Sequence, residues 1–312
     1  MADQAVGVLA ALAAALAYGL GSVLQQRGAS SVQGAGRVGP RLLGRLARSR
    51  IWLAGISGDA VGFVLRAVAL GVSALSLVGP LIASSLLFAL GIQAIIQRRR
   101  LSRRQLCGAS FVTAGITIFL WSARPEGGGA TATSRRWLGV IGVAAAFTLV
   151  CWWFSRRRSG PDARSGAPRS SRAGPATLLS LGAVALFGVT AALTKTVVVE
   201  LGEHGLYSLR HWPIWMLVVV GIGGQVFNQA AYQLAELAVS FPVITAGEPL
   251  VTAVIGVGLF GEHLSTAGWR GPGMATAVVL LLVGVVILTR SVVGLPPTPP
   301  TPAAVLARSG QP

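Results

Sequence analysis

Long apolar stretches separated by short polar tracts run through most of the chain. A helix must offer about 20 mostly apolar residues to cross the hydrocarbon core of a bilayer. Windows of this kind are found at approximately 5–24, 51–71, 73–96, 106–122, 137–155, 177–197, 212–234, 239–260 and 271–290. The pattern therefore predicts an all-α integral membrane protein with about nine transmembrane helices.

The composition supports a membrane location, because 53% of the residues are hydrophobic and only 11% are charged. Soluble domains carry roughly 25% charged residues. The formal net charge of +17 comes mainly from arginines in the connections after the first, third and fifth windows. Such connections tend to stay on the cytoplasmic side. We therefore expect a multi-pass protein of the cytoplasmic membrane with its N-terminus outside and its C-terminus inside, and no nucleic-acid partner is needed to explain the charge.

An internal similarity divides the chain into two halves. Residues 62–81 align with residues 224–243, so that Pro80 meets Pro242. The alignment predicts two four-helix repeats of opposite orientation, because five helices separate the start of one repeat from the start of the other. Inverted repeats with a binding site between them are typical of secondary transporters. The expected units are a first repeat at 1–122, a linker helix with a basic cytoplasmic loop at 123–175, a second repeat at 176–290 and a disordered Pro-rich tail at 291–312.

The stretch from Phe241 to Ser265 carries the Glu248-Pro249 pair six residues after Pro242 and ends in GEHLS. It resembles the drug/metabolite transporter superfamily of EamA-like proteins. Residues 21–29 (GSVLQQRGA) and 77–111 are similar to the NIPA-type magnesium transporter branch of that superfamily. The resemblance implies a membrane transporter without a cofactor. For the magnesium branch, it implies a divalent cation as the substrate.

Four ionisable residues lie inside the apolar windows, where each costs about 2.5–3.5 kcal/mol on insertion scales. Asp59 and Arg66 are seven residues apart and share one face of the second window. Glu248 lies in the eighth window, and Asp59 and Glu248 are the expected ligands if the substrate is magnesium. Lys195 lies toward the outside and is a candidate cation on the outer route, with a structural or interfacial charge as the alternative.

Polar stripes accompany these charges. Gln225, Asn228 and Gln229 form, with Tyr232, a helical stripe that must face protein or a wet cavity rather than lipid. Hydrogen bonds between helices are the alternative role for these amides. A weaker stripe in the first window contains Tyr18, Ser22 and Gln25.

Proline shapes the eighth window. Pro249 removes a backbone donor and frees the carbonyl of Thr245, so that Thr245 and Glu248 could form a local polar site. Pro80, Pro242 and Pro249 are candidate kinks for gating. A carboxylate such as Glu248 or Asp59 could also carry a proton during transport.

These features favour a transporter that moves a small zwitterionic or anionic organic solute by alternating access, with proton coupling as an option. A NIPA-like magnesium or divalent cation transporter is the first alternative, and a non-transporting membrane subunit or lipid-carrier translocator is the second. An enzyme is not expected, because no nucleophile, histidine and acid stand in a recognisable arrangement. Cys107 and Cys151 are expected to be small core residues. The expected partners are a small-molecule or ion substrate and the lipid bilayer, and a homodimer is compatible with the pattern.

Overall fold

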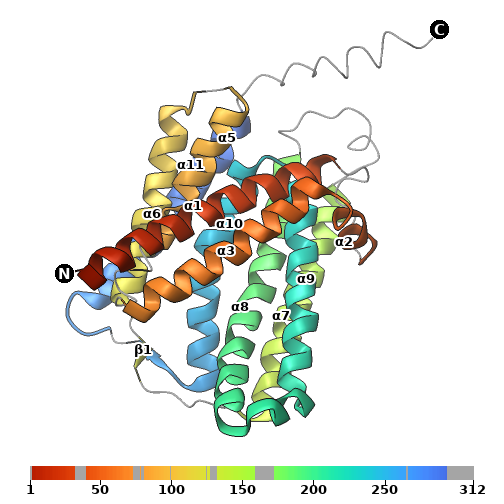
Figure 1. Cartoon of the computed structure of the whole chain (residues 1–312), viewed down its shortest axis with the longest axis vertical. Coiled ribbons are helices and arrows are strands. Elements are labelled where there is room, and N and C mark those ends of the chain that lie inside the picture. The colour runs from red at the N-terminus through yellow and green to blue at the C-terminus, as the bar shows by residue number, and fades with distance from the viewer. Residues whose placement is uncertain are drawn as a thin grey trace.

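The computed structural model describes residues 2–31, 40–72, 78, 81–98, 100–123, 125–126, 132–158, 172–264 and 266–293. Its α-helices are α1 (Ala2–Ser31), α2 (Pro40–Leu46), α3 (Arg50–Val72), α5 (Ser85–Ile96), α6 (Arg103–Ser122), α7 (Ser134–Arg158), α8 (Ala173–His204), α9 (Trp212–Leu234), α10 (Leu237–Ile255) and α11 (Arg270–Val293). The 3-10 helix η3 (Gly205–Arg210) follows α8, and the π-helix η4 (Gly256–Phe260) follows α10. The strands β1 (Pro125–Glu126) and β2 (His263–Leu264) form one antiparallel pair. Figure 1 shows this arrangement of helices.

Seven helices among the described residues are long and apolar enough to cross a membrane. They are α1, α6, α7, α8 continued by η3, α9, α10 continued by η4, and α11. The prediction of an all-α, multi-pass membrane protein is therefore confirmed, whereas the count of about nine transmembrane helices is not. The second window is helical as α3, but α3 carries Asp59 and Arg66 and is not among the seven. The apolar helix at Leu81–Ile96 is too short to be counted.

Two helices continue through polar residues beyond the apolar windows from which they were predicted. The window at 137–155 forms α7, which extends to Arg158, and α8 starts at Ala173, before the window at 177–197. The arginines at the end of α7 extend the helix because Arg156 and Arg157 lie over the rings of Trp152 and Trp153. The residues between α7 and α8, and those after α11, lie outside the described part of the chain.

Glycines allow α1 and α3 to approach closely. A Cβ atom on Gly55 would lie 2.7 Å from the backbone nitrogen of Gln25, and one on Gly62 would lie 2.9 Å from the ring of Tyr18. Gly58 faces the backbone of Gly21 at 3.2 Å. Gly58 and Gly62 are therefore both part of this interface, as small residues at contacting membrane helices allow.

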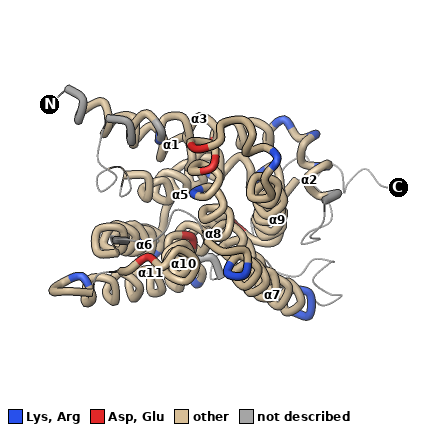
Figure 2. The backbone as a smooth tube through the Cα atoms, turned by 90° about the horizontal axis from the view of Figure 1, so that it is seen from below, with Lys and Arg blue, Asp and Glu red and all other residues tan. Residues whose placement is uncertain are grey.

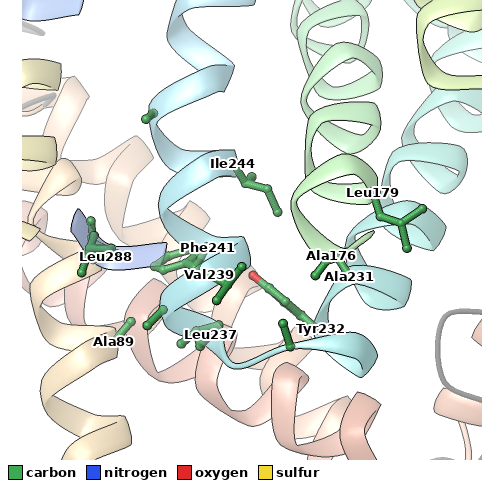
Figure 3. Packing of buried hydrophobic residues seen from close by; sticks show 14 of the residues in the cluster. Ala89, Ala176, Leu179, Ala231, Tyr232, Leu237, Val239, Phe241, Ile244 and Leu288 are labelled. Carbon is green, nitrogen blue, oxygen red and sulfur yellow. The ribbon is translucent and has the colours of Figure 1, made fainter. Parts of the chain in front are cut away.

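The remaining helices pack around α8 and α10. α8 contacts α7, α9 and α10, while α6 and α11 form a separate close pair. Figure 3 shows Tyr232 of α9 extending toward α10, where Leu237 and Val239 lie in the same buried cluster. α1 packs on α3 and α5, just as α8 packs on α9 and α10. Two related halves would show the same helix contacts in each half, as these helices do. The inverted repeat itself stays a prediction.

The two ends of the bundle differ. In Figure 1, the junction of α5 and α6 lies at the upper end, whereas η3 and β1 lie toward the lower end. Figure 2 shows Lys and Arg segments at α2 and at an end of α7, at the periphery of the helices. Cationic residues thus mark helix ends, although the orientation in the membrane stays a prediction.

Candidate functional site

An amide network joins α1, α3 and α9 around Gln25. The Nε2 atom of Gln25 donates a hydrogen bond to the Oδ2 atom of Asp59. The Oε1 atom of Gln25 accepts hydrogen bonds from Gln225 at 3.1 Å and from Gln229 at 2.7 Å. Gln25 is 2% exposed and Gln229 is fully buried. Three helices are therefore tied together by one side chain whose donor and acceptor are both used.

The predicted stripe on α9 is only partly satisfied by this network. Asn228 donates to the Oε1 atom of Gln225 at 3.4 Å, but its own Oδ1 atom is buried without a hydrogen-bond partner. The Oε1 atom of Gln229 is also unpartnered, as are both polar atoms of the Gln233 amide. Buried polar groups without partners are rare. These atoms leave acceptors and donors available to a water molecule or a solute.

Two tyrosines border the network. Tyr232 is 2% exposed and lies beside Ser22 of α1 and Asn228 of its own helix. Tyr18 of α1 is half-buried and interacts with Arg66 of α3. The weak stripe of the first window therefore faces the stripe of α9, and the two stripes meet at the α1–α9 contact.

The charged residues predicted in separate windows come together around Tyr18. Tyr18 lies within electrostatic range of Arg66, Asp59 and Glu248, and Arg66 lies within range of Glu248. The side chains of Arg66 and Glu248 are exposed, and Asp59 is half-buried. Among the described residues, the Glu248 carboxylate accepts no hydrogen bond. We call Tyr18, Asp59, Arg66 and Glu248 the charged cluster.

The surroundings of Glu248 differ from the expectation at one residue. The Thr245 hydroxyl donates to the carbonyl of Phe241 in its own helix at 2.8 Å, so it does not form a hydrogen-bonded site with Glu248. A threonine hydroxyl in a helix often donates to the backbone carbonyl one turn earlier in this way. Pro242 and Pro249 both lie inside α10, which continues as an α-helix through them and changes to the π-helix η4 only at Gly256. Pro80 lies outside the described residues.

Lys195 is held away from the charged cluster by its own partners. Its Nζ atom forms an ion pair with Glu262 and lies 4.4 Å from the centre of the Phe260 ring. Glu262 follows the π-helix, and no sequence pattern had paired it with Lys195. The alternative role of Lys195, that of a structural charge, is therefore supported by a specific partner, Glu262.

No group of three or more His, Cys, Asp and Glu side chains within the described residues is arranged to hold a metal ion. A magnesium site of the expected kind would rest on the two carboxylates Asp59 and Glu248, with amide oxygens and water completing it. Arg66 interacts with Glu248 in this region. The expectation that both cysteines are core residues was wrong for Cys107, which is exposed, while Cys151 is buried.

The fold and the cluster define a multi-pass membrane protein with charged and amide side chains among its helices. The chain is similar to an uncharacterized protein of Corynebacterium glutamicum, with 27% identity over 292 residues that cover 93% of this chain and 97% of that protein. No protein-family model matches the chain. No solved structure matches it either.

Proposed function

We propose that the chain is a secondary transporter of a small zwitterionic or anionic organic solute that works by alternating access. The observation that carries this proposal is the charged cluster, in which residues from α1, α3 and α10 interact. Charged side chains inside membrane helices are costly and are associated with substrate and ion pathways. A cluster of both signs offers partners for both ends of a zwitterion.

The exposure of the charged side chains supports a path that water or a solute can enter. Arg66 and Glu248 are exposed in helices that consist mostly of apolar residues. An exposed charge facing lipid is unfavourable, whereas one facing a hydrated space is satisfied by water. Because Arg66 and Glu248 also interact with each other and with Tyr18, we propose that they border one common hydrated space.

The cluster suggests a role for each group. Arg66 would bind a carboxylate of the solute, since a guanidinium forms two parallel hydrogen bonds with it. Glu248, which accepts no hydrogen bond among the described residues, would bind an ammonium group or carry a proton. Asp59 is already held by Gln25 and would tune the field at Tyr18. Gln225, Asn228 and Gln229 would supply amide contacts from α9.

The packing of the two halves is also consistent with alternating access. The α1 contacts with α3 and α5 have counterparts in the α8 contacts with α9 and α10. Transporters with inverted repeats bind their substrate between such halves, and movement of one half against the other changes which side is open. We place the protein in the cytoplasmic membrane, with the N-terminus outside, from the distribution of arginine.

The magnesium alternative draws on the resemblance to the NIPA-type branch and on the two carboxylates. Magnesium prefers oxygen ligands and keeps several of its waters. The interaction of Arg66 with Glu248 opposes a bare dication and favours a solute with a negative group. The alternative of a subunit or lipid-carrier translocator predicts no solute flux.

Proteoliposomes containing the purified chain test these functions. Uptake of labelled amino acids, organic anions and magnesium would be compared with uptake into empty vesicles. We expect Arg66→Gln and Glu248→Gln to lower uptake of the transported solute at least tenfold, and Glu203→Gln, an exposed residue at the end of α8, to leave it unchanged.

The possible outcomes separate the functions. If the vesicles take up magnesium and no organic solute, and if Glu248→Gln and Asp59→Asn abolish that uptake, the substrate is magnesium and not an organic solute. Absence of flux above empty vesicles for the whole panel, with wild type and variants equally folded, would overturn the transporter proposal.

A further inference from the structure

A pocket of about 420 Å³ lies where the start of α6 meets the end of α11. Its lining consists of Arg103, Arg104, Cys107, Ile287, Arg290 and Ser291. Three of these six residues are arginines from two helices that pack closely, since a Cβ on Gly284 would lie 2.8 Å from the carbonyl oxygen of Gly108. The pocket therefore gathers cations on a rigid two-helix base.

Among the described residues, the arginines of the pocket have no acid beside them in the lining. The chain has nine Asp and Glu residues, and none of those that the structure describes lines the pocket. Within the described part of the chain, Arg103, Arg104 and Arg290 form no ion pair and no side-chain hydrogen bond with another residue. Three guanidinium groups around one pocket repel each other unless an anion lies between them. The pocket is thus complementary to an anion that can accept several hydrogen bonds at once, such as phosphate.

Arg103 and Arg104 occupy positions that helix stability does not favour. They form the first turn of α6, where the helix dipole disfavours cations. The helix start is secured independently by the Ser102 capping box with Gln105. These two arginines therefore do not serve to begin the helix, whereas Arg290 in the last turn of α11 agrees with the dipole.

Apolar surface continues directly from the pocket along both helices. Leu106 is 54% exposed, and Val283 and Val286, one turn from Ile287 and Arg290, are 41% and 47% exposed. Both helices are long and apolar enough to span a membrane, and these exposed side chains offer apolar surface beside the pocket. A phosphate with an acyl chain attached satisfies the arginines and the apolar surface together, and free phosphate satisfies only the arginines.

We propose that this pocket binds the phosphate headgroup of an anionic membrane lipid, with the lipid's chains lying along α6 and α11. Basic pockets between transmembrane helices are known to hold such headgroups, most often on the cytoplasmic side. Arg103 and Arg104 belong to the connection after the third window, one of the tracts that predict the cytoplasmic side, and Arg290 lies at the end of the last window, for which the same side is predicted. The site is independent of the charged cluster and does not require that the chain transports a solute.

Cys107 provides a reporter, because it lines the pocket and is exposed while Cys151 is buried. The full chain is placed in nanodiscs of phosphatidylcholine, with or without phosphatidylglycerol, and the rate of maleimide labelling at Cys107 is measured. We expect phosphatidylglycerol to slow labelling and inorganic phosphate in phosphatidylcholine nanodiscs to have no such effect. The Cys107→Ser variant shows the background. Equal protection by inorganic phosphate would overturn the lipid assignment and indicate a soluble-anion site.

Variants separate specific binding from surface charge. An arginine near an anionic lipid surface contributes about fivefold in affinity, so replacement of Arg103, Arg104 and Arg290 by Gln is expected to weaken phosphatidylglycerol binding roughly 100-fold. The matched control replaces Arg156, Arg157 and Arg158 of α7 by Gln and removes the same charge. We expect only the first variant to lose the lipid-dependent protection of Cys107.

Native mass spectrometry gives a second measurement that does not depend on the thiol. The wild type and the α7 control are expected to retain one more phosphatidylglycerol molecule than the pocket variant. If the triple variant does not fold, the single variant Arg290→Gln replaces it, because Arg290 lies at an exposed helix end. This single substitution should weaken phosphatidylglycerol binding about fivefold. Equal lipid retention in the wild type and the folded pocket variants would overturn the proposal.

Discussion

Gln25 of α1 donates a hydrogen bond to Asp59 of α3, and its acceptor oxygen is shared by two glutamines of α9. One side chain therefore connects an ionisable residue of α3 to a helix far away in the sequence. Its donor and its acceptor are both needed, because the groups that they bind are wholly or partly buried.

Replacement of Gln25 by Ala should destabilise the protein by about 1–3 kcal/mol. The substitution leaves the Asp59 carboxylate and two amide donors without their partner, and unsatisfied buried groups are costly. Thermal unfolding in detergent measures the change. Gln26→Ala is the matched control, because Gln26 makes only a 3.4 Å bond to the carbonyl of Ala235, and it should cost clearly less. Equal losses for the two variants would contradict the network described for Gln25.

Gly55→Ala should also lower stability, by about 1–3 kcal/mol, since the new methyl group would push α1 and α3 apart. Gly142→Ala in α7 is the control, because a Cβ there meets no atom within 4 Å. It should leave stability unchanged or raise it by up to about 1 kcal/mol through helix propensity. Denaturation of both variants in the same detergent would make the comparison, and a harmless Gly55→Ala would show that the two helices are not in close contact.

The ion pair between Lys195 and Glu262 should contribute little to stability. Lys195 is 42% exposed in its side chain, and pairs of this kind are worth about 0.2–1 kcal/mol. A double-mutant cycle with Lys195→Met and Glu262→Gln measures the coupling energy. A value well above 1 kcal/mol would mean that the pair is shielded from water, as happens when it closes against another part of the protein.

The orientation in the membrane can be measured with single cysteines in a Cys107→Ser background, because the remaining Cys151 is buried. A membrane-impermeant maleimide should label Arg103→Cys only from the cytoplasmic side and Glu203→Cys only from the outside. These two residues lie at the start of α6 and the end of α8. Labelling of both positions from one side would contradict the predicted topology.

The sequence predicted the helical membrane class well because hydrophobicity over 20 residues is a strong local signal. It could not predict which polar residues meet. Gln25 belonged to a weak stripe, yet it became the centre of the network, since its role depends on the close approach of α1 to α3 and on the position of α9. Thr245 was expected beside Glu248, but a local bond to Phe241 uses its hydroxyl.

Helix ends were the least predictable part of the fold. Arg156 and Arg157 look like loop residues in sequence, but stacking on tryptophans one turn back keeps them helical. The exposure of Cys107 could not be read from its apolar neighbours, because Gly108 and Ala109 are buried whereas Cys107 lines the pocket between α6 and α11. Confusion between lipid-facing and core positions affects any apolar helix of a membrane protein.

The short pair of β1 and β2 joins Pro125 to Leu264 and Glu126 to His263. One strand follows α6 and the other follows η4, so main-chain hydrogen bonds act as a latch between two distant parts of the chain. While the latch is closed, it holds together the segments that follow α6 and η4 at this side of the bundle. Displacements of the helices would then pivot about this point and be largest at the opposite side, and because a two-stranded pair is weak by itself, the latch can also release.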